Sequence, residues 1–577
     1  MNRTARSLTG LPSVDRPWLK YYSDEAAASP LPECLAYDLL YRSNCGHPDD
    51  IALIYYDRKF TYAQLFEAID RTARAFTALG VRNGSVVILC MLNMPETVWS
   101  LYALNRLGAV PNMVDPRTDA EQLRAYITEC CAQFIVTFDP AYPSISKAAE
   151  GSGVKKIVSV PPSASLPVFR RIIYNIKNKK PAYAGNTLEW KKFIAGGRNT
   201  AAGYSAYEKG RCFVIAHTGG TTGTPKSVML SDDSINAVAH GYRYVDIPFK
   251  RQQKYFNDLP PFIIYGLSLA VHTALCCGMQ VILFPVFDSK AFPGVFAKYR
   301  PNHFSAVADH LKYLSEDSRT KDMDLSFLIS AGVGGDSLNP ELESRVNAYL
   351  RKNGCRYKVM KGYGMTELCA TAVTTSYSAN APGSVGVPLA ANIIKIVNPD
   401  SGVECGYGRT GEVCISSPSA MLGYYNKPDE TASIIEEDEN NVRWVHTGDL
   451  GYMDTDGLLF LEGRIRRIYV TSSENQPAKI FPGMIESVLC GVDGVSGCTV
   501  AGRRMKGSAC YYEPVAFILP SGSMPQEALA KRLDAICMER LPGYMRPAEY
   551  RFMIEFPHTP AGKVDYRELE RLAAGDI

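Results

Sequence analysis

The sequence lacks the cysteine spacing that is typical of structural metal sites and redox centres. It contains 16 cysteines in 577 residues, but no two of them stand in C-x-x-C spacing. Two adjacent pairs, Cys130 with Cys131 and Cys276 with Cys277, lie in apolar stretches. We therefore expect unpaired, buried thiols, as in a protein of a reducing compartment.

An excess of charge of one sign is also missing. The chain has 62 lysines and arginines against 59 acidic residues, a net charge of +3. This balance gives no general attraction to nucleic acid, and 46% hydrophobic and 21% charged residues are ordinary values for a globular protein. A chain of 577 residues is longer than one hydrophobic core usually supports. We expect more than one domain and no nucleic-acid partner.

Uninterrupted apolar runs of membrane-spanning length are absent as well. The basic N-terminus is not followed by the apolar stretch of a signal peptide, so we expect a cytoplasmic protein. No charged residue occurs between Asp258 and Asp288, a length that could span a bilayer. Prolines, glycines and a histidine interrupt this segment. Its pattern instead predicts a helix, a glycine stop and a buried strand.

Short β-branched runs alternate with helical patterns from about residue 50 to 370, as in TYAQLFEAIDRTARAFTALG followed by GSVVILCM. This alternation predicts doubly wound, mostly parallel sheets flanked by helices. Short strands and turns from about residue 381 to 463 predict a small antiparallel, β-barrel-like unit. The strands and helices that follow predict a small α+β domain. The predicted fold class is therefore α/β, with a large N-terminal domain and a small C-terminal one.

A basic segment interrupts this organisation. Residues 155–192 contain nine lysines or arginines and one acid, Glu189. Within it, LPVFRRIIYNIK places apolar residues 166, 169, 172, 173 and 176 on one helical face. We favour a solvated basic surface. The alternative is a weak membrane-surface contact through residues 166–180, which would suit an enzyme of lipid substrates.

A loop rich in glycine and threonine follows an apolar strand near the middle of the chain. Glycines let backbone N–H groups approach an anion, threonine hydroxyls add donors, and a lysine adds positive charge. Pro225 stands where the phosphate loop of kinases and ATPases requires glycine, so those classes are disfavoured. The predicted polyphosphate ligands are Thr218, Gly219, Gly220, Thr221, Thr222, Gly223 and Lys226.

With this loop, four further segments in fixed order resemble the superfamily of adenylate-forming enzymes, and fatty and medium-chain acyl-CoA synthetases in particular. They are Gly362-Tyr-Gly-Met-Thr-Glu367, His446-Thr-Gly-Asp-Leu450, Gly463-Arg464 and Thr559-Pro-Ala-Gly-Lys563. The resemblance covers nearly the whole chain. It implies an enzyme that uses ATP and Mg²⁺ to activate a carboxylic acid as its acyl-AMP, releases pyrophosphate, and then forms a thioester with coenzyme A.

The resemblance also implies roles for single residues. Tyr363 would stack on adenine, Thr366 would bond the α-phosphate and Glu367 would help to hold Mg²⁺, which prefers oxygen ligands. Asp449 would accept hydrogen bonds from both ribose hydroxyls, with Arg464 beside it. Lys563 would bridge the carboxylate and the α-phosphate, where a cation offsets the repulsion of two anions.

In this resemblance the chain divides into an N-terminal AMP-binding domain at 1–463, a hinge at 464–468 and a mobile C-terminal domain at 469–577. Two residues depart from the family pattern: Arg467 stands where many relatives have aspartate, and Ser473 stands where glycine normally lets the pantetheine approach. The loop at 470–482 is also longer than usual. The thiol acceptor is therefore either coenzyme A or the pantetheine of a carrier protein. Arg503 and Arg504 are candidates for the CoA phosphates, although a solvated basic loop is favoured.

The acid is expected to lie beside two apolar residues, Phe262 and Ile263. An isoleucine stands where acyl-CoA ligases often have histidine and amino-acid activators commonly have aspartate. Burying an ammonium without a carboxylate partner would be costly, so an apolar acyl or aryl acid is favoured. A non-catalytic homologue is disfavoured because the charged positions named above are all present. The remaining predicted pocket residues are Gly332, Gly334 and Gly364.

Overall fold

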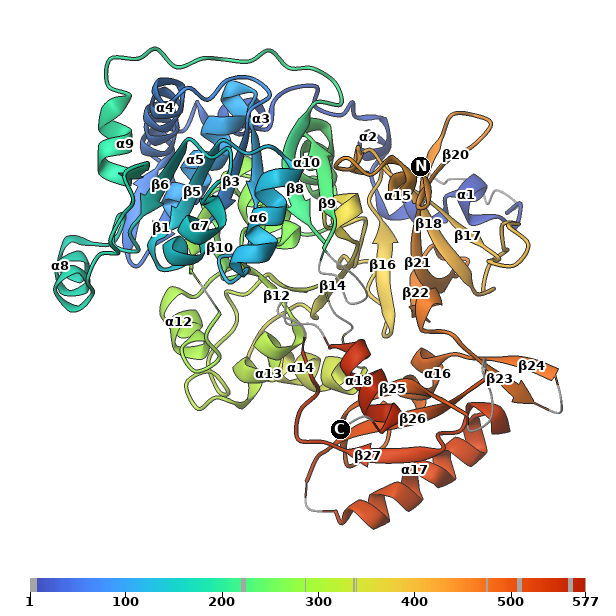
Figure 1. The fold of residues 1–577 in the computed structure, drawn as a ribbon. Coiled ribbons are helices and arrows are strands. Elements are labelled where there is room, and N and C mark those ends of the chain that lie inside the picture. Colours follow the sequence, from blue (N-terminus) through green and yellow to red (C-terminus); the bar gives the residue numbers. More distant parts are fainter. Residues whose placement is uncertain are drawn as a thin grey trace.

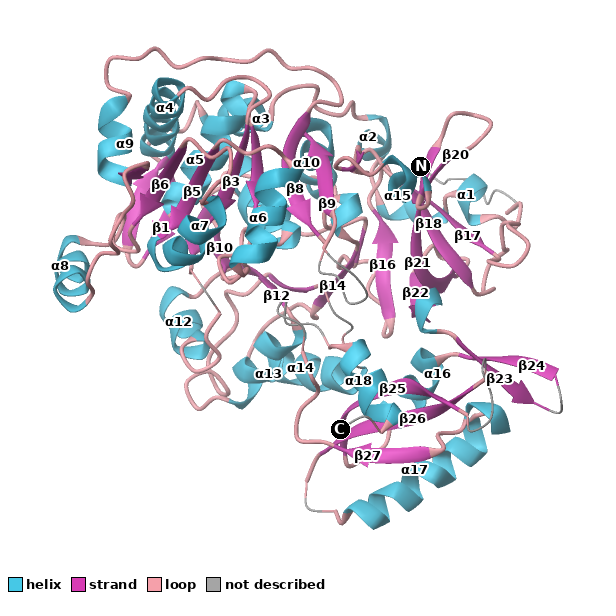
Figure 2. Cartoon of the chain, in the orientation of Figure 1, coloured by secondary structure: helices cyan, strands magenta, loops and turns pink. Residues whose placement is uncertain are grey.

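The structure is a computed structural model that describes residues 8–218, 225–285, 287–335, 338, 340–473, 476–505, 511–522, 524–558 and 564–575. Figure 1 shows a large domain, coloured blue to light orange, and a smaller orange-red C-terminal domain below it. The secondary structure is mixed throughout, with helices on both sides of the sheets of the large domain (Figure 2). This is the α/β class that the sequence predicts.

One sheet of the large domain has the strand order β19-β9-β8-β4-β3-β5-β6-β7. Its strands pair in parallel from β8 to β7, whereas β9 and β19 are antiparallel additions at one edge. The predicted strand GSVVILCM is β3, at the centre of this sheet. The bounds are β3 Val86–Cys90, β4 Val110–Met113, β5 Phe134–Phe138, β6 Lys156–Val160, β7 Thr187–Glu189, β8 Cys212–His217, β9 Ser227–Ser231 and β19 Gly423–Tyr424.

The second sheet contains a parallel half in the order β14-β13-β12-β10-β11-β1, with β2 antiparallel at its edge. Parallel strands end at the same edge of a sheet, and the residues predicted to surround the acid lie at this edge. The bounds are β1 Ile51–Tyr55, β2 Arg58–Thr61, β10 Lys254–Asn257, β11 Gln280–Leu283, β12 His303–Ala306, β13 Ser330–Val333 and β14 Met360–Tyr363.

The antiparallel strands after residue 370 continue this second sheet. The predicted barrel-like unit is not a separate closed barrel among the described residues, because β15 and β16 connect its strands to β14 in one hydrogen-bonded path. The turn pattern predicted the strands correctly, but it contained no signal for their connection to β14 through β15. The bounds are β15 Val373–Thr374, β16 Ser384–Pro388, β17 Ile393–Val397, β18 Gly411–Ser416, β20 Ile435–Glu437, β21 Arg443–Met453 and β22 Leu459–Arg464.

The helices of the large domain start and stop at the expected signals. Thr61 and Gln64 form a capping box at the start of α4, and Gly80 ends it with φ +97°. Pro95 opens α5 and Gly108 ends it with φ +73°. The principal bounds are α3 Ala36–Asn44, α4 Tyr62–Leu79, α5 Pro95–Leu107, α6 Ala120–Glu129, α7 Tyr142–Ala149, α8 Val168–Lys177, α9 Trp190–Gly196, α10 Asp232–Tyr242, α12 Phe292–Tyr299, α13 Ala308–Glu316, α14 Pro340–Lys352 and α15 Pro428–Ala432.

The segment without charged residues forms a helix, a glycine stop and a strand, as predicted. A π-helical stretch, Gly266–Thr273, continues into the short α11, Ala274–Cys276, and Gly278 with φ +72° precedes β11. In the part of the chain that the structure describes, no helix is long and apolar enough to cross a membrane.

The described cysteines are all unpaired. Most are buried or half-buried, but Cys45 and Cys131 are exposed, which corrects the expectation that both members of the first adjacent pair are buried. Cys131 adopts φ +48° in the turn after α6, so its backbone reverses direction and its neighbour Cys130 alone packs into the core.

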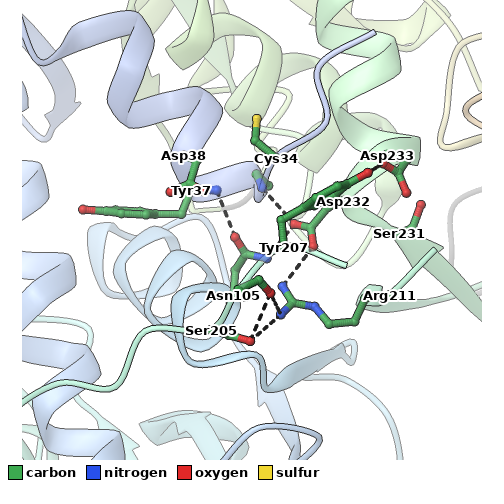
Figure 3. A network of polar contacts seen from close by, with 12 residues as sticks. Cys34, Tyr37, Asp38, Asn105, Ser205, Tyr207, Arg211, Ser231, Asp232 and Asp233 are labelled. Atoms are coloured by element: carbon green, nitrogen blue, oxygen red, sulfur yellow. Dashed lines mark hydrogen bonds and ion pairs between the residues drawn. The ribbon is translucent and has the colours of Figure 1, made fainter. Parts of the chain in front are cut away.

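A buried carboxylate fixes the hairpin of β8 and β9 to the helices beside it. Asp232, at the start of α10, accepts hydrogen bonds from the Ala36 backbone N–H at 2.8 Å and the Asn105 amide at 2.7 Å (Figure 3). The Arg211 guanidinium lies 3.0 Å from the same carboxylate. These contacts join α3, α5 and α10 to the residue that precedes β8, so they anchor the open end of the β8–β9 hairpin, opposite to the glycine-rich loop.

The C-terminal domain has hydrophobic cores of its own. Its buried apolar residues lie between Ile480 and Ala573, and none of them joins the clusters of the large domain in the described residues. A three-stranded sheet, β25-β26-β27, packs against its helices. The bounds are β23 Tyr469–Ser473, β24 Gln476–Ile480, α16 Pro482–Cys490, β25 Val495–Arg504, β26 Tyr512–Pro520, α17 Gln526–Arg540, β27 Glu549–Phe552 and α18 Tyr566–Ala574.

Glu96 makes the stability of the large domain depend on pH. Its side chain is 1% exposed in α5 and accepts a 2.6 Å hydrogen bond from Ser165 Oγ. Burial raises its pKa to about 7. When an acid has a higher pKa in the folded protein than in the unfolded chain, the free energy of unfolding decreases as pH rises from the ordinary pKa of the acid to the raised one. We therefore expect the wild type to lose on the order of 2–3 kcal/mol relative to Glu96→Gln between pH 4.5 and pH 8.

Urea unfolding of both proteins at several pH values measures this difference. Glu121→Gln, at an exposed position in α6, is the matched control and should follow the wild type at every pH. If the free energies of unfolding of the wild type and Glu96→Gln change in parallel between pH 4.5 and pH 8, the role of Glu96 is contradicted.

Candidate active site

The residues predicted to surround the acid lie at or just after the carboxyl ends of parallel strands in the second sheet. Phe262 and Ile263 come after β10, Gly334 comes after β13, and Gly364 comes after β14. These strands lie in the order β14-β13-β12-β10, so the loops that follow them meet at one edge. This edge is the usual place for a ligand in an open α/β sheet.

The glycine-rich loop joins β8 to the antiparallel β9. This strand-loop-strand arrangement differs from the strand-loop-helix of the P-loop, in agreement with Pro225. Thr218 and Lys226 close the base of the loop, since each backbone N–H donates to the other residue, at 3.0 Å in both cases. The predicted ligands Gly219, Gly220, Thr221, Thr222 and Gly223 lie outside the described residues.

Tyr363, Asp449 and Arg464 form one hydrogen-bonded group. The Tyr363 hydroxyl donates to one oxygen of Asp449 at 2.7 Å, and the other oxygen lies 2.9 Å from Arg464 Nε. Asp449 and Arg464 are direct partners across β21 and β22. Burial, together with the carboxylate, raises the pKa of Tyr363, so it is neutral and donates. The structure thus brings together three residues that are distant in the sequence.

Glu367 lies near Lys226, with Tyr424 between them. The Tyr424 hydroxyl donates to Glu367 Oε1 at 2.7 Å, and Lys226 Nζ lies 4.5 Å from the centre of the Tyr424 ring. Lys226 is also ion-paired with Glu430 at 2.6 Å. The 6% exposed Glu367 and the half-buried Lys226 therefore contact the same side chain, Glu367 at its hydroxyl and Lys226 over its ring.

The turn that carries Thr366 and Glu367 is strained. Cys369 and Ala370 both adopt positive φ, +54° and +87°, which is uncommon for residues other than glycine. Gly364 approaches this turn so closely that a Cβ there would lie 1.7 Å from the Ala370 carbonyl oxygen. Gly364 is therefore required by backbone packing, which is a different reason from the pocket space that the sequence suggested.

Tyr265 lies over two of the predicted pocket glycines. A Cβ on Gly334 would meet the Tyr265 ring at 3.3 Å, and a Cβ on Gly332 would meet its hydroxyl at 3.7 Å. Phe262 is buried with the Arg117 guanidinium 6.0 Å from its ring, and Ile263 is half-buried. The space next to the glycines is thus shaped by a phenol side chain.

The predicted hinge connects the end of β22 to the C-terminal domain. The Arg467 guanidinium pairs with Glu486, donates to the Val500 carbonyl at 3.0 Å and lies 3.9 Å from the Tyr566 ring. Arg467 is therefore anchored within the C-terminal domain, which gives a physical reason for arginine at this position. A Cβ on Gly483 would lie 2.1 Å from the Glu462 carbonyl oxygen, so the two domains touch closely beside the hinge.

The candidates for thiol transfer are only partly described. Ser473 ends β23, whose hairpin with β24 contacts the large domain through an ion pair of Lys479 with Asp400 at 2.8 Å. Arg503 pairs with Glu513 and Glu549 inside the domain, so its charge is already matched, which argues against a role with the CoA phosphates. Arg504 lies beside Tyr512. Lys563 lies outside the described residues.

Sequence reasoning missed Tyr424, Glu430 and the individual role of Tyr265. In MLGYYNKPDET, Tyr424 and Tyr425 stand between a glycine and the acidic start of a helix. This pair of aromatic residues was the signal in the sequence that could have identified Tyr424. Tyr265 stood inside the segment that was assigned to the acid. Its position over the glycines depends on the pairing of β10, β12 and β13, which the sequence does not specify.

The residues present fit a magnesium ion. Glu367 supplies a hard oxygen donor in a buried position, and one carboxylate with phosphate oxygens is the usual environment of Mg²⁺. Tyr424 donates a hydrogen bond to one of the two carboxylate oxygens of Glu367. A bound Mg²⁺ would neutralise negative charge on the phosphates.

A large α/β domain, a glycine-rich loop between the antiparallel strands β8 and β9, and a small second domain together are typical of an adenylate-forming enzyme. The chain belongs to the AMP-binding enzyme family: the sequence profile of that family matches residues 40–425. The profile of the AMP-binding enzyme C-terminal domain matches residues 484–563.

Several characterised proteins are similar along nearly the whole chain. A long-chain-fatty-acid–CoA ligase of Bacillus subtilis is 27% identical over 575 residues, covering 96% of this chain and 97% of that protein. A 2-succinylbenzoate–CoA ligase of Bacillus cereus is 27% identical, covering 91% of this chain and 96% of that protein. The crystal structure of an anthranilate CoA ligase with anthranoyl-AMP has a TM-score of 0.79 at 22% identity, covering 95% of this chain and 99% of that one. The last similarity supports the fold.

Proposed function

We propose that this protein is an AMP-forming acid–thiol ligase whose thiol is coenzyme A and whose acid is apolar. It activates a carboxylic acid with ATP and Mg²⁺ and then forms the CoA thioester. In the first step a carboxylate oxygen attacks the α-phosphorus and pyrophosphate leaves. In the second step the thiolate attacks the acyl carbon and AMP leaves. The observation that carries this proposal is the convergence of Tyr363, Asp449 and Arg464 with the Glu367 turn at one sheet edge.

The proposed roles follow from the contacts. Asp449 already has both oxygens positioned by neighbours and would accept the ribose hydroxyls, while Tyr363 forms the wall for adenine. Lys226, together with Thr218 and the loop beyond it, would hold the β- and γ-phosphates. Its ion pair with Glu430 places the ammonium at the loop before ATP arrives. Thr366 and Glu367 would face the α-phosphate and Mg²⁺, and Lys563 would come from the C-terminal domain.

The residues that line the predicted acid pocket fit an apolar acid. Phe262 is buried and Ile263 is half-buried, and neither can pair with an ammonium group. The named ligases of the two Bacillus species act on long-chain fatty acids and 2-succinylbenzoate, which both contain a large apolar part. We therefore infer a fatty or aryl acid as the substrate class.

Tyr265 is expected to set the length of the acid. Tyr265→Ala removes the ring that lies over Gly332 and Gly334, so longer acids gain room. The ratio of kcat/KM for dodecanoate to that for octanoate should rise by about tenfold, since a few methylene contacts are worth this much in a pocket. Tyr265→Phe keeps the ring and should behave like the wild type. An unchanged ratio in Tyr265→Ala would place the acid elsewhere.

The domain division proposed from the sequence is supported by the separate cores and by the glycine contact at Gly483. We propose the AMP-binding domain at 1–463, the hinge at 464–468 and the C-terminal domain at 469–577, with rotation about the hinge between the two half-reactions. A carrier-protein pantetheine is the alternative acceptor, motivated by Ser473 and the hairpin that contains it. We place the reaction in the cytoplasm, where ATP and CoA are available.

ATP–pyrophosphate exchange with fatty, aryl, dicarboxylic and amino acids tests the proposal. Exchange is expected with fatty or aryl acids and not with amino acids. Formation of acyl-CoA by the purified protein with free CoA would then assign coenzyme A, and not a carrier-protein pantetheine, as the thiol acceptor. Absence of exchange with every acid would contradict the proposal, and exchange without acyl-CoA would favour the carrier protein.

A further inference from the structure

Helix α8 projects from the large domain and presents an apolar face to solvent. None of its ten residues is buried, and Figure 1 shows it standing away from the body of the domain. Phe169 is 74% exposed, Ile172 51% and Ile176 79%. With 100° between successive residues, these side chains and Ile173 lie on one side of the helix.

The opposite side of α8 faces the protein. Tyr174 packs against the main core, and the Arg170 guanidinium lies 5.4 Å from the Tyr56 ring and 3.7 Å from Asp57. Ser163 Oγ donates to the Asn175 side chain at 2.8 Å. The helix is thus attached to the protein by its polar and aromatic residues, and its apolar side therefore faces the solvent. In an ordinary surface helix the two sides are reversed.

Positive charge surrounds this apolar face. Residues 155–188 contain no acidic residue, and Glu189 is the only acid up to residue 192. Arg171 is half-buried, and six further basic side chains are exposed: Arg170, Lys177, Lys179, Lys180, Lys191 and Lys192. An apolar helix face with a basic border complements an anionic membrane surface, where apolar side chains enter the acyl boundary and the cations meet lipid headgroups.

We propose that α8, with the basic residues 177–180, docks this enzyme on anionic lipid bilayers. The helix would lie in the plane of the interface, with Phe169, Ile172, Ile173 and Ile176 in the lipid. The inference goes beyond the proposed ligase activity and does not rest on it. If the acid is apolar, docking would also place the enzyme at the surface where such acids partition.

Co-sedimentation of the full chain with vesicles tests the docking. The wild type should bind vesicles of 30% phosphatidylglycerol in phosphatidylcholine and bind pure phosphatidylcholine more weakly, with binding that decreases as salt rises. The triple variant F169S/I172S/I176S should lower the partition coefficient by at least about tenfold. The triple variant K177Q/K179Q/K180Q should lose most of the preference for anionic lipid.

A matched control is available on other surfaces of the same protein. Val403, Met538 and Ile554 are 64%, 62% and 101% exposed, so V403S/M538S/I554S removes a similar apolar surface away from α8. This control should bind like the wild type. Equal binding by the wild type and the α8 triple variant, or no binding to anionic vesicles by the wild type, would overturn the proposal.

The depth to which α8 enters the bilayer and the oligomeric state of the protein test the docking in two independent ways. Lipids with brominated acyl chains should quench the fluorescence of the tryptophan introduced by Phe169→Trp. They should not quench the fluorescence of the tryptophan introduced by Met538→Trp. A wild-type dimer that becomes monomeric in F169S/I172S/I176S, without any vesicle binding, would instead assign this face to a second copy and overturn membrane docking. Activity on a short, water-soluble acid should be equal in all variants, because α8 contributes no residue to the proposed site.

Discussion

Lys563→Ala is expected to lower the rate of acyl-adenylate formation by about 10²–10³-fold, the effect of removing one positioned electrostatic group from a transition state. The attacking carboxylate and the α-phosphate are both anions, and negative charge accumulates as the bond to pyrophosphate breaks. An ammonium that bridges them lowers this repulsion, most strongly in a closed site. Binding of ATP should be preserved, because the nucleotide contacts proposed for Tyr363 and Asp449 come from the large domain.

The half-reactions separate this role from a general loss of activity. ATP–pyrophosphate exchange should fall in Lys563→Ala, while formation of acyl-CoA from synthetic acyl-AMP and CoA should stay near the wild-type rate. Lys531→Ala, in α17 of the same domain, is the control and should leave both rates unchanged. Near wild-type exchange by Lys563→Ala would contradict the assignment.

Glu367→Gln is expected to lower adenylation by a similar factor, about 10²–10³, and to raise the Mg²⁺ concentration needed for half-maximal rate. The variant keeps an oxygen that can accept the 2.7 Å hydrogen bond from Tyr424, but it removes the negative charge that a hard cation prefers. Exchange rates measured across a series of MgCl₂ concentrations report both changes.

Tyr424→Phe provides the comparison for Glu367→Gln. It removes the hydrogen bond but keeps the carboxylate and the ring beside Lys226, so we expect less than about a tenfold loss and an ordinary Mg²⁺ requirement. If Glu367→Gln lowers the rate with no change in its Mg²⁺ requirement, then Glu367 supports the turn and does not hold the metal.

Much of the large domain could be predicted because its elements are encoded locally. The core strands are short buried runs, and α4 carries its own capping box and glycine stop. The antiparallel strand β9 that follows the glycine-rich loop agrees with Pro225 in distinguishing this segment from a P-loop, in which a helix follows. In these places each local signal agrees with the final fold.

The relations between distant segments could not be predicted from the residues alone. Tyr424 meets Glu367 across 57 positions, and only the pairing of β19 with β9 brings it there. The continuity of β14, β15 and β16, which joins the predicted barrel-like unit to the parallel strands, had no signal in the sequence. The pattern of α8 showed one apolar face and one polar face, but it contained no information about which of them packs on the protein.

The most direct test of the central claim is the product balance of a complete reaction. The purified protein is incubated with ATP, MgCl₂, CoA and each acid of a fatty and aryl series, and all products are quantified by chromatography. Equal amounts of AMP, pyrophosphate and acyl-CoA, formed only when an acid is present, are the predicted result. Formation of ADP and phosphate, or AMP release that is independent of every acid, would contradict an AMP-forming acid–CoA ligase.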